Sequence, residues 1–183
     1  MVGLIIAIVV VVVLAVAVVV WAISTSNRFK VLLVKIKEAD SGIDVALTKR
    51  YDTLTKTIEV VKGYAKHETE LFAQVINLRA GMSTMEKSAA SQGMDDLTKK
   101  INVVAEAYPE LRSSDNYKQL QEAIADAEDH LQAARRVFNM NVSSFNQSIV
   151  VFPASIIANG AHYAARDFFM ADEAKRADVK IDL

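Results

Sequence analysis

Uncharged, apolar residues fill the start of the chain. The run from Val2 to Ile23 contains no Asp, Glu, Lys or Arg, and the first charged side chain is Arg28. A helix rises about 1.5 Å per residue, so this run would measure about 33 Å and match the roughly 30 Å hydrocarbon core of a bilayer. Because lipid offers the backbone no hydrogen-bond partner, a helix is expected even for so many valines. We predict an N-terminal transmembrane anchor over residues 1–27.

A cleaved signal peptide is the alternative interpretation of the same run. Such a peptide begins with basic residues, has a shorter apolar stretch and ends at a small-residue cleavage site. The run here lacks the basic start and a clear cleavage site, and Trp21 stands near its end, where an indole favours a membrane interface. We therefore expect the anchor to be retained.

After the anchor, apolar residues recur at alternating steps of three and four, the spacing of a helix that packs into a bundle or coiled coil. The stripe consists of Ile36, Ile43, Leu47, Tyr51, Leu54, Ile58, Val61, Ala65, Phe72 and Val75. Neither proline nor glycine occurs between Gly3 and Gly42, so we expect one helix to run from the anchor into the stripe. At Gly63 we expect a bend or a point of close packing.

A serine-rich, loop-like stretch from Gly81 to Gly93 precedes the second predicted helix. Asp95 and Asp96 would open this helix as a cap and a first-turn acid. Pro109 would end it, because the residue before a proline leaves the helical region.

A third long helix is predicted to begin near residues 113–115, which offer capping side chains. Its apolar stripe again alternates steps of three and four, with one stutter. The stripe consists of Tyr117, Leu120, Ile124, Ala127, Leu131, Ala134, Phe138, Val142, Phe145, Ile149 and Phe152. Pro153 either stops this helix or opens a short one that closes at Gly160.

Together these elements predict an all-α fold, in which an N-terminal transmembrane helix continues into an elongated antiparallel three- to four-helix bundle. We assign the bundle to residues 28–160 and a partly helical or extended tail to residues 161–183. The tail contains three adjacent large apolar residues, Phe168, Phe169 and Met170. Since these cannot all face one helix core, we expect some of them to contact a neighbouring molecule or the membrane surface.

Charge is nearly balanced over the whole chain, with 21 basic and 22 acidic residues, and gives no reason to expect a nucleic-acid partner. Four basic residues nevertheless follow the anchor before the first acid, Glu38. This membrane-proximal basic collar consists of Arg28, Lys30, Lys35 and Lys37. By the positive-inside rule we expect the amino terminus outside and the main domain in the cytoplasm, with membrane lipid as a partner of the collar.

Residue types that carry catalysis or bind metal are sparse. The chain has no cysteine, which excludes thiol nucleophiles and thiolate zinc sites. A di-iron bundle needs Glu-x-x-His motifs, and none of His67, His130 and His162 has a glutamate three residues before it. Leu71 stands where a metalloprotease motif would need its second histidine. We therefore expect no catalytic residues, no metal, no cofactor and no small-molecule substrate.

One polar set on the third long helix stands out because its spacings of seven, four and seven place it on one side. This polar face consists of Glu128, Arg135, Asn139 and Asn146. It is either a ligand or partner pocket completed by Arg50, Asp52 or Glu106, or a set of polar groups that fixes the register of the bundle. We favour the second interpretation, since a buried asparagine has that role in coiled coils.

Two stretches resemble the LemA family of bacterial proteins. The first, IDVALTKRYDTLTKTIEVVKGYAKHE, spans Ile43–Glu68. The second and more specific stretch spans Ala105–Ala158 and contains AEAYPEL, an LQ pair, an ARR-aromatic-Asn step, a later Phe-Asn and a closing Phe-Pro. The family's usual Pro-Asn pair is replaced by Thr55-Lys56, and Ser26-Asn27 stands in place of its Tyr-Asn.

The resemblance implies a membrane-anchored, elongated antiparallel helical bundle of bacterial type, without established enzymatic activity or cofactor. We expect a non-enzymatic scaffold at the bacterial cell membrane that binds copies of itself or other membrane-associated proteins. The alternatives are an accessory or regulatory subunit of a membrane-associated enzyme or signalling system, and an organising factor of a specialised membrane.

Overall fold

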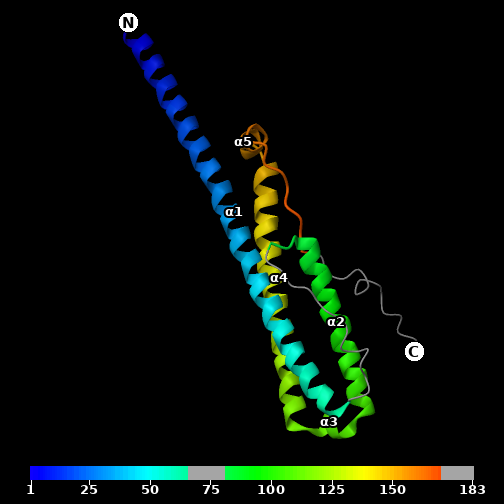
Figure 1. The fold of residues 1–183 in the computed structure, drawn as a ribbon. Helices are drawn as coiled ribbons and strands as arrows, with labels where there is room; N and C mark the ends of the chain where they lie inside the picture. The colour runs from blue at the N-terminus through cyan, green and yellow to red at the C-terminus, as the bar shows by residue number, and fades with distance from the viewer. Residues whose placement is uncertain (66–80, 170–183) are drawn as a thin grey trace, which may run out of the picture. The chain divides into compact units, whose positions relative to one another are not determined.

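The computed structural model describes residues 1–65 and 81–169, and these form five helices (Figure 1). They are α1 (Val2–Tyr64), α2 (Thr84–Ala107), α3 (Pro109–Ser113), α4 (Asp115–Val150) and α5 (Ala154–Gly160). Every regular element in the described residues is therefore helical, which confirms the all-α prediction.

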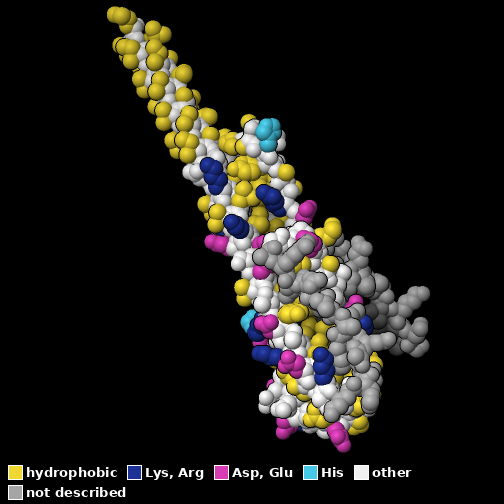
Figure 2. Space-filling view, in the orientation of Figure 1, with side chains coloured by type: hydrophobic (Ala, Val, Ile, Leu, Met, Phe, Trp, Pro, Cys, Tyr) yellow, Lys and Arg dark blue, Asp and Glu magenta, His cyan; other side chains and the backbone are white. Residues whose placement is uncertain are grey.

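Helix α1 is a single element of 63 residues, so the predicted continuity from the apolar run into the stripe is confirmed as far as Tyr64. The apolar first part of α1 has a mean hydropathy of 3.5, and none of its side chains is buried. Among the helices of the described residues, α1 alone has the length and composition to cross a membrane. Figure 2 shows this length of α1 covered by apolar side chains. The predicted stripe residues Phe72 and Val75 lie outside the described residues.

Of the two roles expected for Gly63, a bend or a point of close packing, the second is wrong. It lies one residue before the end of α1, and a Cβ atom built there would meet nothing within 4 Å. It is therefore not a point of close packing.

Helix α2 begins about three turns earlier than predicted, which corrects the assignment of Gly81–Gly93 as a loop. The Ser83 hydroxyl accepts a hydrogen bond from the Glu86 backbone N–H, and the Glu86 carboxylate accepts one from the Ser83 N–H at 2.8 Å. This reciprocal capping box satisfies two backbone donors at the helix start. Asp95 and Asp96 consequently lie inside the helix and are not its caps.

The predicted stop at Pro109 is confirmed, because α2 ends at Ala107 and Pro109 opens α3. Helix α4 follows the predicted range but ends at Val150. Phe152, predicted as the last apolar stripe residue, lies beyond that end and is 76% exposed. Its core assignment was wrong because the helical spacing no longer applies after Val150.

Contacts between residues divide the chain into two compact units. Unit 1 comprises Met1–Glu38 and Met140–Asp167, and unit 2 comprises Ala39–Asn139 and Phe168–Leu183. The predicted boundaries at residues 27 and 160 follow sequence composition instead, and they stay predictions.

The core of unit 1 forms where α1, α4 and α5 meet. Phe29, Phe145, Ile149 and Ala158 are buried there, and Tyr163 packs against them. The Tyr163 ring meets Phe29 edge to face at 5.3 Å between ring centroids and Phe145 at 6.1 Å. Such edge-to-face pairs stabilise a core beyond the area that they bury.

A left-handed residue closes α5 and directs Tyr163 into this core. The Tyr163 N–H donates to the Ala158 carbonyl at 3.0 Å, and the His162 N–H donates to the Asn159 carbonyl at 3.1 Å. This is the Schellman pattern, in which the residue after the C-cap takes a positive φ. Here that residue is His162, with φ 55°, rather than the predicted Gly160.

The core of unit 2 is formed by the apolar stripes of α1, α2 and α4, together with Leu111 of α3 and Phe169. Asp40 of α1 contacts Lys87 of α2, and Arg50, later on α1, contacts Asp95, later on α2. Helices α1 and α2 therefore run parallel. Helix α4 runs antiparallel to α2, because Arg135 contacts Ser91 whereas Tyr117 contacts Asn102.

Candidate functional site

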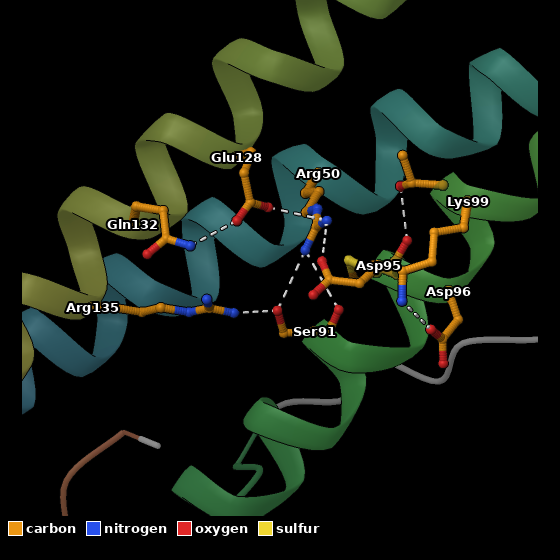
Figure 3. A network of polar contacts seen from close by, with 10 residues as sticks. Arg50, Ser91, Asp95, Asp96, Lys99, Glu128, Gln132 and Arg135 are labelled. Atoms are coloured by element: carbon orange, nitrogen blue, oxygen red, sulfur yellow. Dashed lines mark hydrogen bonds and ion pairs between the residues drawn. The ribbon is translucent and has the colours of Figure 1, made fainter. Parts of the chain in front are cut away.

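The most connected polar cluster in the described residues centres on Arg50 of α1, within unit 2 (Figure 3). Its Nη1 donates to the Ser91 carbonyl at 3.4 Å and to the Ser91 hydroxyl at 3.3 Å. Its Nη2 lies 2.5 Å from Asp95 Oδ1 and 3.0 Å from Glu128 Oε2. One guanidinium group thereby links α1, α2 and α4.

The position of Arg50 follows from the helical spacing, since it lies on α1 between the buried Leu47 and Leu54. Only 4% of its side chain is exposed, against 15% for Asp95 and 29% for Glu128. A buried charge is tolerated when it is paired and hydrogen-bonded, and the fork of an arginine can engage several acceptors at once. The arrangement neutralises the arginine inside the bundle.

Glu128 and Arg135 extend the cluster along α4. Gln132 Nε2 donates to Glu128 Oε1 at 2.8 Å, and Arg135 Nη2 donates to the Ser91 hydroxyl, which therefore accepts from both arginines. Burial lowers the pKa of Arg135 from its usual value; Glu128 and Asp95 oppose this shift, and Arg50 adds to it.

Asn139 joins the bundle to the chain that follows α5. Its Nδ2 donates to the Phe169 carbonyl at 3.0 Å, and its Oδ1 accepts from the Phe169 N–H at 2.8 Å. The Phe169 ring is buried and lies 4.9 Å from the Arg135 guanidinium carbon, a cation–π distance. Phe169 therefore contacts its own domain, Phe168 is exposed, and Met170 lies outside the described residues.

Asn146 makes the same type of pairing within unit 1. Its amide donates to the Arg166 carbonyl at 2.9 Å and accepts from the Arg166 N–H at 2.8 Å. The predicted polar face thus comprises two kinds of contact. Glu128 and Arg135 join charged groups of other helices, whereas Asn139 and Asn146 bind backbone.

Of the three residues considered as completing a pocket, Arg50 meets the polar face. Asp52 is exposed. Glu106 lines a separate hollow of about 430 Å³ in unit 2, beside Asn102, Arg112 and Tyr117. There the Tyr117 hydroxyl donates to Asn102 Oδ1 at 3.3 Å, and burial raises the pKa of Tyr117.

Sequence reasoning missed the α2 members of the cluster, because it placed Ser91 in a loop and interpreted Asp95 as a helix cap. Ser91 stands three residues before Met94 and six before Leu97, and its place in line with these apolar residues was the available signal. It also missed Lys87, a buried lysine whose Nζ lies 2.7 Å from both Asp40 Oδ1 and Asp44 Oδ1 on α1.

Lys87 supports a prediction about alkaline pH. Burial acts to lower the pKa of Lys87, but hydrogen bonds and attraction from Asp40 and Asp44 outweigh it, so the pKa is raised above the ordinary 10.5. The ion pairs therefore stabilise the fold from neutral pH up to about 10.5, and this contribution is lost as the pH rises through the raised, folded pKa of Lys87. We expect urea unfolding to show wild type more stable than Lys87→Met at neutral pH, with the difference shrinking above 10.5. A difference that is constant through this range would contradict the assignment.

Histidines and acids provide no metal site in the described part of the chain, where no group of three such side chains could hold an ion. His130 lies 3.5 Å from Asp126 on the surface of α4, and His162 closes α5. His67 lies outside the described residues.

The basic collar lies on α1 directly after the apolar run, and the side chains of Arg28, Lys30, Lys35 and Lys37 are all exposed. Asn141 Nδ2 donates to the Lys35 backbone carbonyl at 3.3 Å, which fixes α4 against this part of α1 within unit 1.

In the described residues, the fold and the site define a class: a helical protein with a helix suited to crossing a membrane and a charged network that joins the helices of its bundle. A sequence model of the LemA family matches residues 39–183, and the chain belongs to this family. Protein LemA of Metamycoplasma hominis is 29% identical over 150 residues, covering 79% of this chain and 68% of that protein. Magnetosome protein MamQ of Magnetospirillum gryphiswaldense is 25% identical over 80 residues, covering 44% of this chain and 29% of that protein.

Proposed function

We propose that this protein is a non-enzymatic scaffold, anchored in the bacterial cell membrane by the start of α1, whose cytoplasmic bundle binds copies of itself. The observation that carries the proposal is that one unbroken helix contains both the apolar run and the α1 side of the bundle. Anchors that share a bilayer raise the effective concentration of the domains attached to them, which favours association through weak contacts.

The central cluster supports a structural role within the bundle rather than a chemical one. A nucleophile, a base and an orienting group would have to meet in one place, and the central cluster instead pairs each arginine with acceptors of neighbouring helices. The exposed basic collar supports a cytoplasmic bundle, because cations remain preferentially on that side.

Crosslinking in native membranes, followed by affinity purification and sizing, tests self-association. We expect a ladder of homo-oligomers. A fixed second protein in stoichiometric amount would favour an accessory subunit instead, and monomer alone would contradict both forms of binding. The name of the magnetosome relative supports a third alternative, a role in organising a specialised membrane, which predicts enrichment in a distinct membrane fraction.

Orientation has its own test, because the natural chain has no cysteine. Val103, 67% exposed on α2, can be replaced by cysteine without disturbing the core. We expect a membrane-impermeant maleimide to label Val103→Cys only after the cells are permeabilised. Labelling of intact cells would place the bundle outside.

A further inference from the structure

The turn between α4 and α5 exposes a group of large apolar side chains that the fold does not use. Within the corner of residues 150–157, Val150, Val151, Phe152 and Ile156 are between 58% and 76% exposed. Figure 2 shows hydrophobic atoms gathered around this end of unit 1. Soluble surfaces seldom expose such a group without a partner.

The corner lies beside the end of the membrane-spanning run, within unit 1. A hollow of about 430 Å³ is lined by Val151 and Phe152 of the corner and by Trp21, Thr25 and Arg28 of α1. Since the apolar run ends at Ile23, these α1 residues mark the depth at which the helix would leave the bilayer. The corner is therefore placed at the membrane interface by the fold of unit 1 itself.

The distribution of charged residues in unit 1 also favours a position of the corner at the membrane interface. Residues 137–165 contain no Asp, Glu, Lys or Arg, and the corner itself, residues 150–157, also has no His, so it carries no side-chain charge that a bilayer would have to desolvate. Apart from the Arg28 guanidinium, the polar side chains that line the hollow are neutral, and they include Thr25, Ser144, Gln147 and Ser148. An arginine beside neutral donors suits a phosphate group.

We propose that the α4–α5 corner is a second membrane contact. Phe152 and Ile156 enter the boundary between headgroups and acyl chains in the leaflet from which α1 emerges, and a phospholipid headgroup occupies the hollow with its phosphate near Arg28. This inference rests on the proposed span of α1. A second contact beside a single span restrains unit 1 against rotation about the axis of α1.

Single-cysteine labelling tests the contact in the full chain, reconstituted in vesicles of phosphatidylcholine and phosphatidylglycerol. Phe152→Cys and Ile156→Cys carry an environment-sensitive nitrobenzoxadiazole group, and both original side chains are exposed, so folding is preserved. We expect dibrominated phospholipid to quench both labels. Val103→Cys, on α2 of unit 2, is the matched control, because the exposure of Val103 lies between those of Phe152 and Ile156, and its label should not be quenched.

A label within the span separates failure of this inference from failure of the proposed function. If Val16→Cys is quenched but the labels at 152 and 156 behave like that at 103, the corner contact is wrong and the span stands. If Val16→Cys is not quenched, the span itself is wrong. Blue-shifted emission at 152 without quenching would show that protein covers the corner, which also overturns the proposal.

The headgroup part is tested through Arg28. With the label at 152, brominated phosphatidylglycerol should quench more strongly than brominated phosphatidylcholine. Arg28→Gln should remove this preference, whereas Lys37→Gln, an exposed collar residue that does not line the hollow, should keep it. If both variants lose the preference for phosphatidylglycerol equally, Arg28 acts only through general electrostatic attraction to anionic lipid, and the headgroup site is wrong.

Discussion

Arg50→Ala is expected to lower the free energy of unfolding by about 3 kcal/mol, the lower end of the range for breaking a buried ion pair. The substitution leaves Asp95 and Glu128 without their shared guanidinium. Glu128 is 29% exposed, so water recovers part of the loss and the effect stays near that lower end. Chemical denaturation of the full chain in detergent micelles, followed by circular dichroism, measures the change.

Lys49→Ala is the matched control, one residue away on α1. It removes the 2.6 Å pair with Asp126, in which both side chains are exposed, although the hydrogen bond from Lys49 lowers the pKa of Asp126. Exposed pairs contribute about 0–1 kcal/mol. If Arg50→Ala unfolds like wild type but abolishes self-association, the cluster is a binding site rather than the set of register-fixing groups that we favour.

Phe145→Ala should be the most damaging core change in unit 1, with a loss of about 4 kcal/mol. Phe145 is fully buried and packs with Phe29 and Tyr163, so truncation leaves a cavity and removes an edge-to-face contact. The same denaturation experiment measures it, with near-ultraviolet dichroism as a second probe of the aromatic packing.

Phe152→Ala provides a control of the same residue type. Phe152 is 76% exposed, so its truncation should change stability by about 0.5 kcal/mol or less. Equal losses for the two phenylalanines would contradict the placement of α5 over the core of unit 1. A selective effect of Phe152→Ala on lipid contact would instead agree with the proposed membrane corner.

Helical spacing was sufficient to predict most of the core. On α4, Ile124, Leu131, Phe138 and Val142 are all buried as the stripe predicts, because burial in a bundle follows the helical repeat. The start of α2 was mispredicted because serine and glycine composition suggested a loop, while the Ser83–Glu86 capping box favours a helix. Local hydrogen bonding outweighed composition.

The partners of the polar face could not be predicted, because they depend on which helices become neighbours. The spacing placed Glu128 and Arg135 on one side of α4, and nothing in that spacing identifies Ser91 or Asp95 on α2 as their contacts. The parallel direction of α1 and α2 could not be predicted either, because apolar spacing describes one helix at a time and not its orientation relative to another.

The pairing of Asn146 with Arg166 restricts the residue at position 146 and leaves the side chain at position 166 free to vary. Asn146 pairs with the backbone N–H and carbonyl of Arg166, and Arg166 itself is exposed. A carboxamide is required at position 146, since a carboxylate would lack the donor and a shorter side chain would lack the reach. Position 166 can accept almost any residue except proline, which has no N–H. At residue 166 the segment after α5 is thus held by its peptide groups, and this position retains freedom to vary its surface chemistry, whereas Tyr163 and Phe169 on either side are held by their side chains.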